Sequence, residues 1–189
     1  TQSKEPKELM DKTKFVPWHK DANCYELCKQ ILANYGINYP GSPEHVYQLL
    51  YEDGNEGDLK FASANPGVDY ERAIECIDRH LNNDKPIIAG VNYDIGFANS
   101  DGTDHFIVIT GRGYDSQLGQ YYYTFMDCGT SIVDHGCNTN VNRLYYNDFL
   151  PTFEGNSLGT GNGEVNLSVT HVRPNDGNTE NTTKMHNYK

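Results

Sequence analysis

The strongest constraint on the fold is a change of sequence period part-way along the chain. Apolar residues recur at spacings of three and four in residues 22–35 and 69–82, which predicts two amphipathic helices. Short runs rich in Ile, Val, Tyr and Phe then follow and predict strands. The predicted strands are residues 87–93, 105–113, 121–127, 142–150 and 165–173. Helices followed by an antiparallel sheet predict an α+β fold, with the N-terminal helices packed on the sheet.

The ends of the helical segments carry local signals. Asp21 is the expected N-cap of the first helix, and Gly36 is the residue expected to end it. Ser42 and Pro43 predict a further short helix over residues 43–52, because proline suits the first turn of a helix.

The 189 residues suit one domain with a core of useful size. We expect a single domain over residues 1–173. Residues 174–189 contain almost no apolar side chains and predict a flexible tail. Residues 94–104 are rich in Gly, Asn and Asp and predict a loop, in which the segment NSDGTD is a plain turn rather than a calcium site.

The net charge of −11 argues against a nucleic-acid partner, because a basic patch would have to overcome it. No apolar run approaches the roughly 18 residues that a membrane-spanning helix needs, so we expect no membrane span. No signal peptide is seen at Thr1, and the compartment is left open.

Five cysteines are too few for a disulfide scaffold. Cys128 and Cys137 either pair with each other across a loop or are free thiols. Together with His135 they also suggest zinc, but no CxxC pair or fourth ligand is evident, so we expect no metal and no other cofactor. An odd cysteine remains in any case, which directs attention to a reactive thiol.

Cys24 is the cysteine whose position favours reactivity. It lies in the first turn of the first predicted helix, where the helix dipole lowers the pKa of a thiol. Cys28 lies one turn further on, where this field is weaker. His105 stands where a polar loop meets an apolar strand, so the sheet fixes its side chain beside a cleft. These two positions predict a nucleophile, Cys24, and its base, His105.

Asp127 ends the next strand along the chain. If residues 105–113 and 121–127 form a hairpin, the end of the second strand lies beside the start of the first. Asp127 can then orient the imidazole of His105 and favour its protonated form. The sequence therefore predicts a triad of nucleophile, base and orienting acid.

Four segments carry a resemblance to a known family: NCYELCKQILANYGI, KPIIAGVNY, DHFIVITGRGYD and YYYTFMD. They resemble the bacteriocin-leader-processing (double-glycine) branch of the papain-like cysteine peptidases. The resemblance implies a papain-like fold and hydrolysis of amide bonds through a Cys thioester, without a metal. It further implies a peptide or peptidoglycan substrate, a role as a secreted or periplasmic effector, and an inhibitor or immunity protein as partner.

One position departs from the family pattern. The family usually places a Gln several residues before the nucleophile, where it helps to bind the oxyanion, and the position six before Cys24 is Trp18. Trp18, His19 and Asn23 are the candidate oxyanion donors, together with the N–H of Cys24. The missing Gln leaves two alternatives to hydrolysis: a binding or effector module without activity, and a deamidase or transglutaminase-type acyl transferase.

Overall fold

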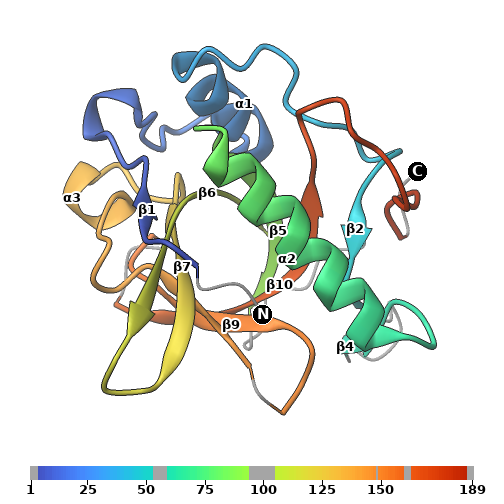
Figure 1. Cartoon of the computed structure of the whole chain (residues 1–189). Coiled ribbons are helices and arrows are strands. Elements are labelled where there is room, and N and C mark those ends of the chain that lie inside the picture. Colours follow the sequence, from blue (N-terminus) through green and yellow to red (C-terminus); the bar gives the residue numbers. More distant parts are fainter. Residues whose placement is uncertain (1–3, 53–58, 94–104, 148, 160–162, 187–189) are drawn as a thin grey trace.

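An antiparallel sheet that closes on itself forms the body of the protein (Figure 1). The computed structural model describes residues 4–52, 59–93, 105–147, 149–159 and 163–186. Within these, the barrel strands are β5 (Ile87–Tyr93), β6 (His105–Asp115), β7 (Gln120–Met126), β8 (Arg143–Tyr146), β9 (Phe153–Ser157) and β10 (Val165–Arg173). Their order is β6–β5–β10–β9–β8–β7, and β7 pairs again with β6.

The expected α+β fold of papain-like type, with N-terminal helices packed on an antiparallel sheet, is wrong. The protein is β-rich, and its sheet is a closed barrel of six antiparallel strands. Closure depends on β9, which pairs with β8 on one edge and with β10 on the other. In the described residues the α-helices are α1 (Cys24–Asn34), α2 (Pro66–Asn82) and the single turn α3 (Val133–Gly136).

Short elements surround the barrel. They are β1 (Lys7–Glu8), the 3₁₀ turn η1 (Lys12–Lys14), β2 (Tyr47–Gln48), β3 (Leu50–Glu52) and β4 (Leu59–Phe61). The short helix predicted over residues 43–52 is therefore wrong. Residues 46–50 are all buried and run extended, because β2 pairs with β10 and β3 pairs with β4. These tertiary contacts outweigh the local helix signal of Ser42 and Pro43.

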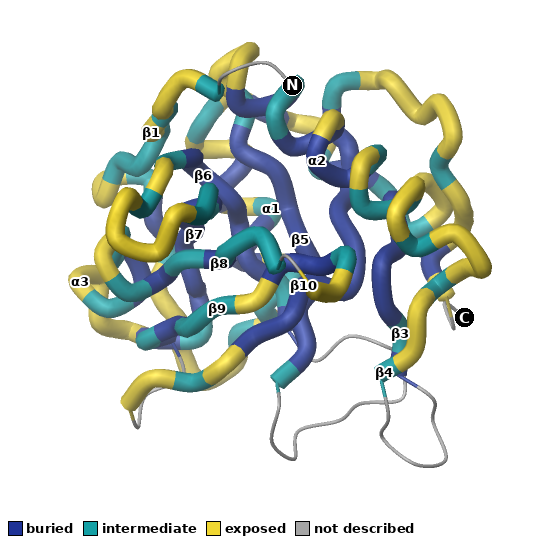
Figure 2. Tube along the Cα trace, turned by 60° about the horizontal axis from the view of Figure 1, so that its bottom comes forward, coloured by how far each residue is buried: buried dark blue, intermediate teal, exposed yellow. Residues whose placement is uncertain are grey.

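Two apolar clusters lie on opposite faces of β5 and β6. All six barrel strands contribute to the first cluster, which therefore fills the barrel interior, and α2 packs against it. The second cluster lies outside the barrel, where α1 packs on Ile88, Val108 and Met126. Figure 2 shows β5, β6 and β10 buried along most of their length, with the exposed residues concentrated in the connections around them.

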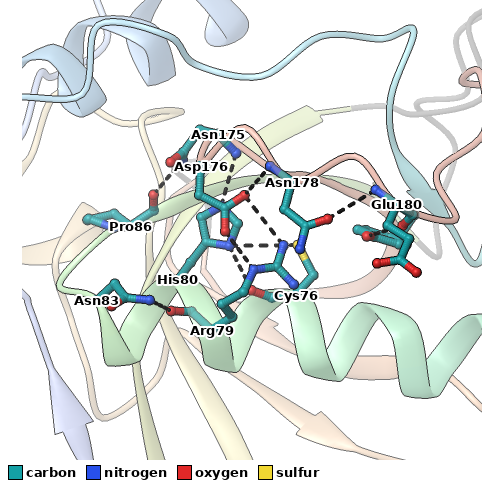
Figure 3. Close-up of polar contacts among 10 residues, drawn as sticks. Cys76, Arg79, His80, Asn83, Pro86, Asn175, Asp176, Asn178 and Glu180 are labelled. Carbon is teal, nitrogen blue, oxygen red and sulfur yellow. Dashed lines mark hydrogen bonds and ion pairs between the residues drawn. The ribbon is translucent and has the colours of Figure 1, made fainter.

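The C-terminal segment lies against the body of the protein in its described part, residues 174–186. The backbone N–H of Asn175 donates to Nε2 of the buried His80, at 2.9 Å. Asp176 accepts from Nε of Arg79 at 2.6 Å (Figure 3). Where the sequence predicts a flexible tail, the structure thus shows a segment attached to α2.

Three further observations bear on the sequence-based expectations. Among the described residues, no helix has the length and apolar run that a membrane crossing requires. In the same residues, no group of three or more His, Cys, Asp and Glu is arranged to hold a metal ion. The predicted loop over residues 94–104, with its NSDGTD turn, lies outside the described residues.

The barrel closure can be tested at Gly155 in β9. A Cβ added there would overlap the backbone carbonyl of Arg143 on the paired strand β8. We expect Gly155→Ala to lower the free energy of unfolding by about 1–3 kcal/mol, measured by urea denaturation. Gly67→Ala in the first turn of α2 is the matched control, because a Cβ there meets no atom within 4 Å. Equal stability of the two variants would contradict the pairing of β8 with β9.

Candidate active site

Cys24 is the first residue of α1, so it lies at the positive end of the helix dipole. The side-chain oxygen of Asn23 accepts from the N–H groups of Tyr25 and Glu26, at 3.0 and 3.3 Å. The N-cap is therefore Asn23 rather than the predicted Asp21. The thiol of Cys24 is half-buried, and the backbone of Phe106 and Tyr25 contributes to lowering its pKa. Such a position favours a thiolate.

His105 and Asp127 form a short, buried ion pair at one end of the barrel. His105 is the first residue of β6, and its Nε2 lies 2.7 Å from Oδ1 of Asp127, which directly follows β7. The antiparallel pairing of β6 with β7 brings these two strand ends together. The His105 side chain also lowers the pKa of the Cys24 thiol, which adds Cys24 to the group. Because Nε2 is engaged by Asp127, Nδ1 is the ring nitrogen left for the thiol.

The charges of the three groups support one another. Burial alone would raise the pKa of the Cys24 thiol, but the hydrogen bond and positive charge of His105 outweigh burial and lower it. Burial alone would likewise lower the pKa of His105, but the charge and hydrogen bond of Asp127 and the bond to Cys24 raise it well above its ordinary value. Both shifts favour a thiolate and an imidazolium as the resting pair.

Asp127 is fully buried and every contact it makes stabilises its charge. Besides His105, Oδ1 accepts from the backbone N–H of Gly129 at 2.8 Å. Oδ2 accepts from the hydroxyl of Ser157 at 2.6 Å. Burial raises the pKa of Asp127, but His105, Ser157 and Gly129 together lower it below its ordinary value. Asp127 is thus fixed both in charge and in orientation.

Ser157 and Gly159 are site residues that sequence reasoning missed. Ser157 ends β9, is fully buried, and accepts from the N–H of Gly159 at 2.9 Å. A Cβ on Gly159 would overlap the Asp127 carboxylate, so a glycine is needed there. The segment FEGNS lacks the apolar alternation of a strand, and nothing in it connects Ser157 with a residue 30 positions earlier.

Arg173 joins the two segments that carry the nucleophile and the base. Its guanidinium carbon lies 4.8 Å from the ring centroid of Tyr25 and 4.8 Å from that of Phe106. These aromatic residues directly follow Cys24 and His105 in the sequence. The buried His171 accepts from Nε of Arg173 at 3.1 Å, which is consistent with the low pKa that burial and the Arg173 charge give this imidazole.

The three oxyanion candidates lie close to the nucleophile in sequence but differ in what they contact. The Asn23 side-chain oxygen is used as the cap of α1. The backbone N–H of Trp18 donates to the carbonyl of Thr130, which attaches residue 18 to the loop after Asp127. Among the described residues, no hydrogen bond joins the side chains of Trp18 or His19 to another group, nor does the N–H of Cys24 have an acceptor.

The remaining four cysteines differ from Cys24 in their electrostatics or surroundings. All five are free thiols in the structure, including the pair Cys128 and Cys137 for which a disulfide was one alternative. Burial raises the pKa of Cys28 well above its ordinary value, with Cys128 as the next cause. Burial also raises the pKa of Cys76 to about 12 and that of Cys137 to about 11.

Comparisons with protein-family models, with curated proteins and with solved structures found no match. The geometry of the site is therefore the basis for any statement about function.

The electrostatics predict a pH profile for alkylation. We expect iodoacetamide to modify Cys24 at pH 6, because the pKa of this thiol is lowered and that of His105 is raised. Mass spectrometry of protein quenched at intervals gives the rate at each pH. In His105→Ala the rate at pH 6 should fall by at least about tenfold, since the thiol loses its main stabilising partner. If the alkylation rate of the wild type rises with a midpoint at or above pH 9, the ordinary pKa of a thiol, the ion pair of Cys24 with His105 would be contradicted.

Proposed function

We propose that the protein is a cysteine peptidase or amidase, which hydrolyses amide bonds through a thioester on Cys24. The observation that carries this proposal is the buried pair of His105 and Asp127 at 2.7 Å, whose imidazole also lowers the pKa of the Cys24 thiol. A thiol at a helix N-terminus, an imidazole that lowers its pKa and a carboxylate that orients the imidazole are the elements of covalent acyl transfer. Cys76, His80 and Asp176 also bring a thiol, an imidazole and a carboxylate together, but Cys76 lies inside α2 and burial raises its pKa to about 12.

The order of events follows from the resting charges. The Cys24 thiolate attacks the amide carbonyl carbon, and the N–H of Cys24 donates to the oxyanion that forms. The His105 imidazolium then gives its proton to the leaving amine, which leaves an acyl group on the sulfur. Water attacks this thioester, His105 accepts a proton from the water, and the acid product is released. Asp127 holds the imidazole in orientation throughout.

The substrate class is the second part of the proposal. The order of Cys, His and Asp along the chain is that of the leader-processing peptidases which the sequence resembles, and this order supports a peptide substrate. Peptidoglycan stem peptides contain amide bonds of the same kind and are the cell-wall substrate of this class. Hydrolysis of stem peptides would fit a secreted effector with an inhibitor or immunity protein as its partner. The papain-like fold class is not part of the proposal, since the barrel contradicts it.

Product analysis in isotopically labelled water tests the proposal. Purified stem-peptide fragments and double-glycine peptides are incubated with the protein, and new products are identified by mass spectrometry. Hydrolysis gives a new carboxyl group that carries one labelled oxygen. Acyl transfer gives instead a product joined to an added amine, and deamidation converts Gln to Glu without chain cleavage. The absence of any such product, or the same product from protein alkylated at Cys24, would sink the proposal.

A further inference from the structure

Two buried thiols meet directly behind the candidate site. Cys28 lies on α1, one turn after Cys24, and Cys128 directly follows Asp127. Their Sγ atoms are 3.8 Å apart, and both residues are fully buried. The surrounding side chains are apolar and include Leu27 and Met126. Neither sulfur takes part in the proposed mechanism, so the contact needs its own explanation.

The pair differs from the other cysteines of the chain. Cys76 lies on α2 with its sulfur beside His80, and Cys137 follows α3. Within the described ranges, the contact of Cys28 with Cys128 is the only one between two sulfur atoms at hydrogen-bond distance. A disulfide bond is about 2.0 Å long, so the two sulfurs must come about 1.8 Å closer to form one.

We propose that Cys28 and Cys128 are an oxidative modification site, at which a disulfide forms by exchange with a low-molecular-weight disulfide. Each cysteine loses its S–H bond and one S–S bond forms between them. The two electrons and two protons pass to the small disulfide, whose own S–S bond breaks to give two free thiols. Glutathione disulfide is a suitable probe of this class.

The cross-link would connect the two segments that position the triad. It joins α1, which carries the nucleophile, to the segment directly after β7, which contains Asp127, across 100 residues of chain. Closing so long a loop restricts the unfolded chain strongly, so the disulfide should raise the Tm by roughly 5 °C or more. The cross-link involves sulfur atoms that the proposed mechanism leaves unused, so its formation does not depend on amide hydrolysis.

Refolding in glutathione buffers tests the proposal. Full burial and the raised pKa of Cys28 make exchange slow in the folded protein, so the reduced chain is refolded from urea at increasing fractions of oxidised glutathione. Free thiols are then blocked and the protein is digested for peptide mapping. Cys24→Ser is used as the parent, because it removes the reactive thiol and with it any dependence on the proposed activity. We expect one cross-link, which joins the peptides that contain Cys28 and Cys128.

The controls separate this pair from a general tendency to oxidise. Cys76→Ser is the matched variant, because it removes a fully buried cysteine of a different cluster, and it should keep the cross-link and the rise in Tm. Cys128→Ser should lose both. If Cys128→Ser does not fold, the peptide map of the Cys24→Ser parent still shows whether Cys28 and Cys128 are cross-linked. Complete blocking of Cys28 and Cys128 after refolding under the most oxidising buffer, or a cross-link to Cys137, would overturn the proposal.

Discussion

Replacing Cys24 by alanine is expected to abolish amide hydrolysis, with a fall in kcat/KM of about 10⁴-fold or more. The sulfur is the atom that becomes acylated in the proposed mechanism, and no other group can take its place. Cys28 is one turn away but fully buried, and its raised pKa keeps it a neutral thiol. Steady-state hydrolysis of the substrate identified by product analysis gives the measurement.

The loss must be separated from damage to the fold. Cys24 is only half-buried, so Cys24→Ala should unfold within about 1 kcal/mol of the wild type. Cys76→Ala is the matched control for removal of a sulfur. Cys76→Ala leaves a cavity in the first apolar cluster, so it should lower the free energy of unfolding while leaving kcat unchanged. Full hydrolytic activity in Cys24→Ala would show that the nucleophile lies elsewhere.

The local elements could be predicted from the sequence more fully than the fold. The helical spacing of apolar residues predicted α1 and α2. Runs of apolar residues predicted the barrel strands with strong apolar patterns, such as β5 and β6. The closure of the sheet could not be predicted, because it depends on β9, whose sequence FEGNS shows no alternation. Strands β2 and β3 were missed for a related reason. They are only 2 and 3 residues long, and each is stabilised by pairing with another strand, β2 with the distant β10 and β3 with β4.

The triad residues could be found because each lies at the end of a periodic element. Cys24 begins a helix, His105 begins a strand and Asp127 follows one, and the structure brings these three together. Ser157 could not be found in this way. Its contact with Asp127 exists only because the barrel closes and brings the end of β9 next to the end of β7. The same closure explains why a glycine is required at position 159.

Substitution of Asp127 should lower both the stability of the fold and the catalytic activity. Its carboxylate accepts from His105, Ser157 and Gly129, and alanine would leave these buried donors without an acceptor. We expect Asp127→Ala to lower the free energy of unfolding by about 3–5 kcal/mol, measured by urea denaturation. We also expect kcat/KM to fall by about 10³–10⁴-fold, because the imidazole loses its orientation.

The pH dependence of this stability loss follows from the two pKa shifts. The pKa of Asp127 is lowered by folding, so its contribution is fully present above 3.8 and is lost as the pH falls through its value in the folded protein. The pKa of His105 is raised, so its contribution is fully present below 6.5 and is lost as the pH rises through its folded value. The difference in the free energy of unfolding between wild type and Asp127→Ala should therefore be largest between these two pH values. It should narrow as the pH falls through the folded pKa of Asp127 and as it rises through the folded pKa of His105.

Asp127→Asn is the variant that separates the charge of this residue from its hydrogen bonds. The amide oxygen can accept from His105 and Gly129, and the amide N–H₂ can donate to the hydroxyl of Ser157. We expect this variant to unfold closer to wild type than Asp127→Ala and to retain more activity. Its activity should also decline at a lower pH on the alkaline side, because the pKa of His105 falls when the carboxylate charge is removed. If the asparagine and alanine variants lose the same stability and the same activity, then the hydrogen bonds of Asp127 do not position His105, and the carboxylate acts through its charge alone.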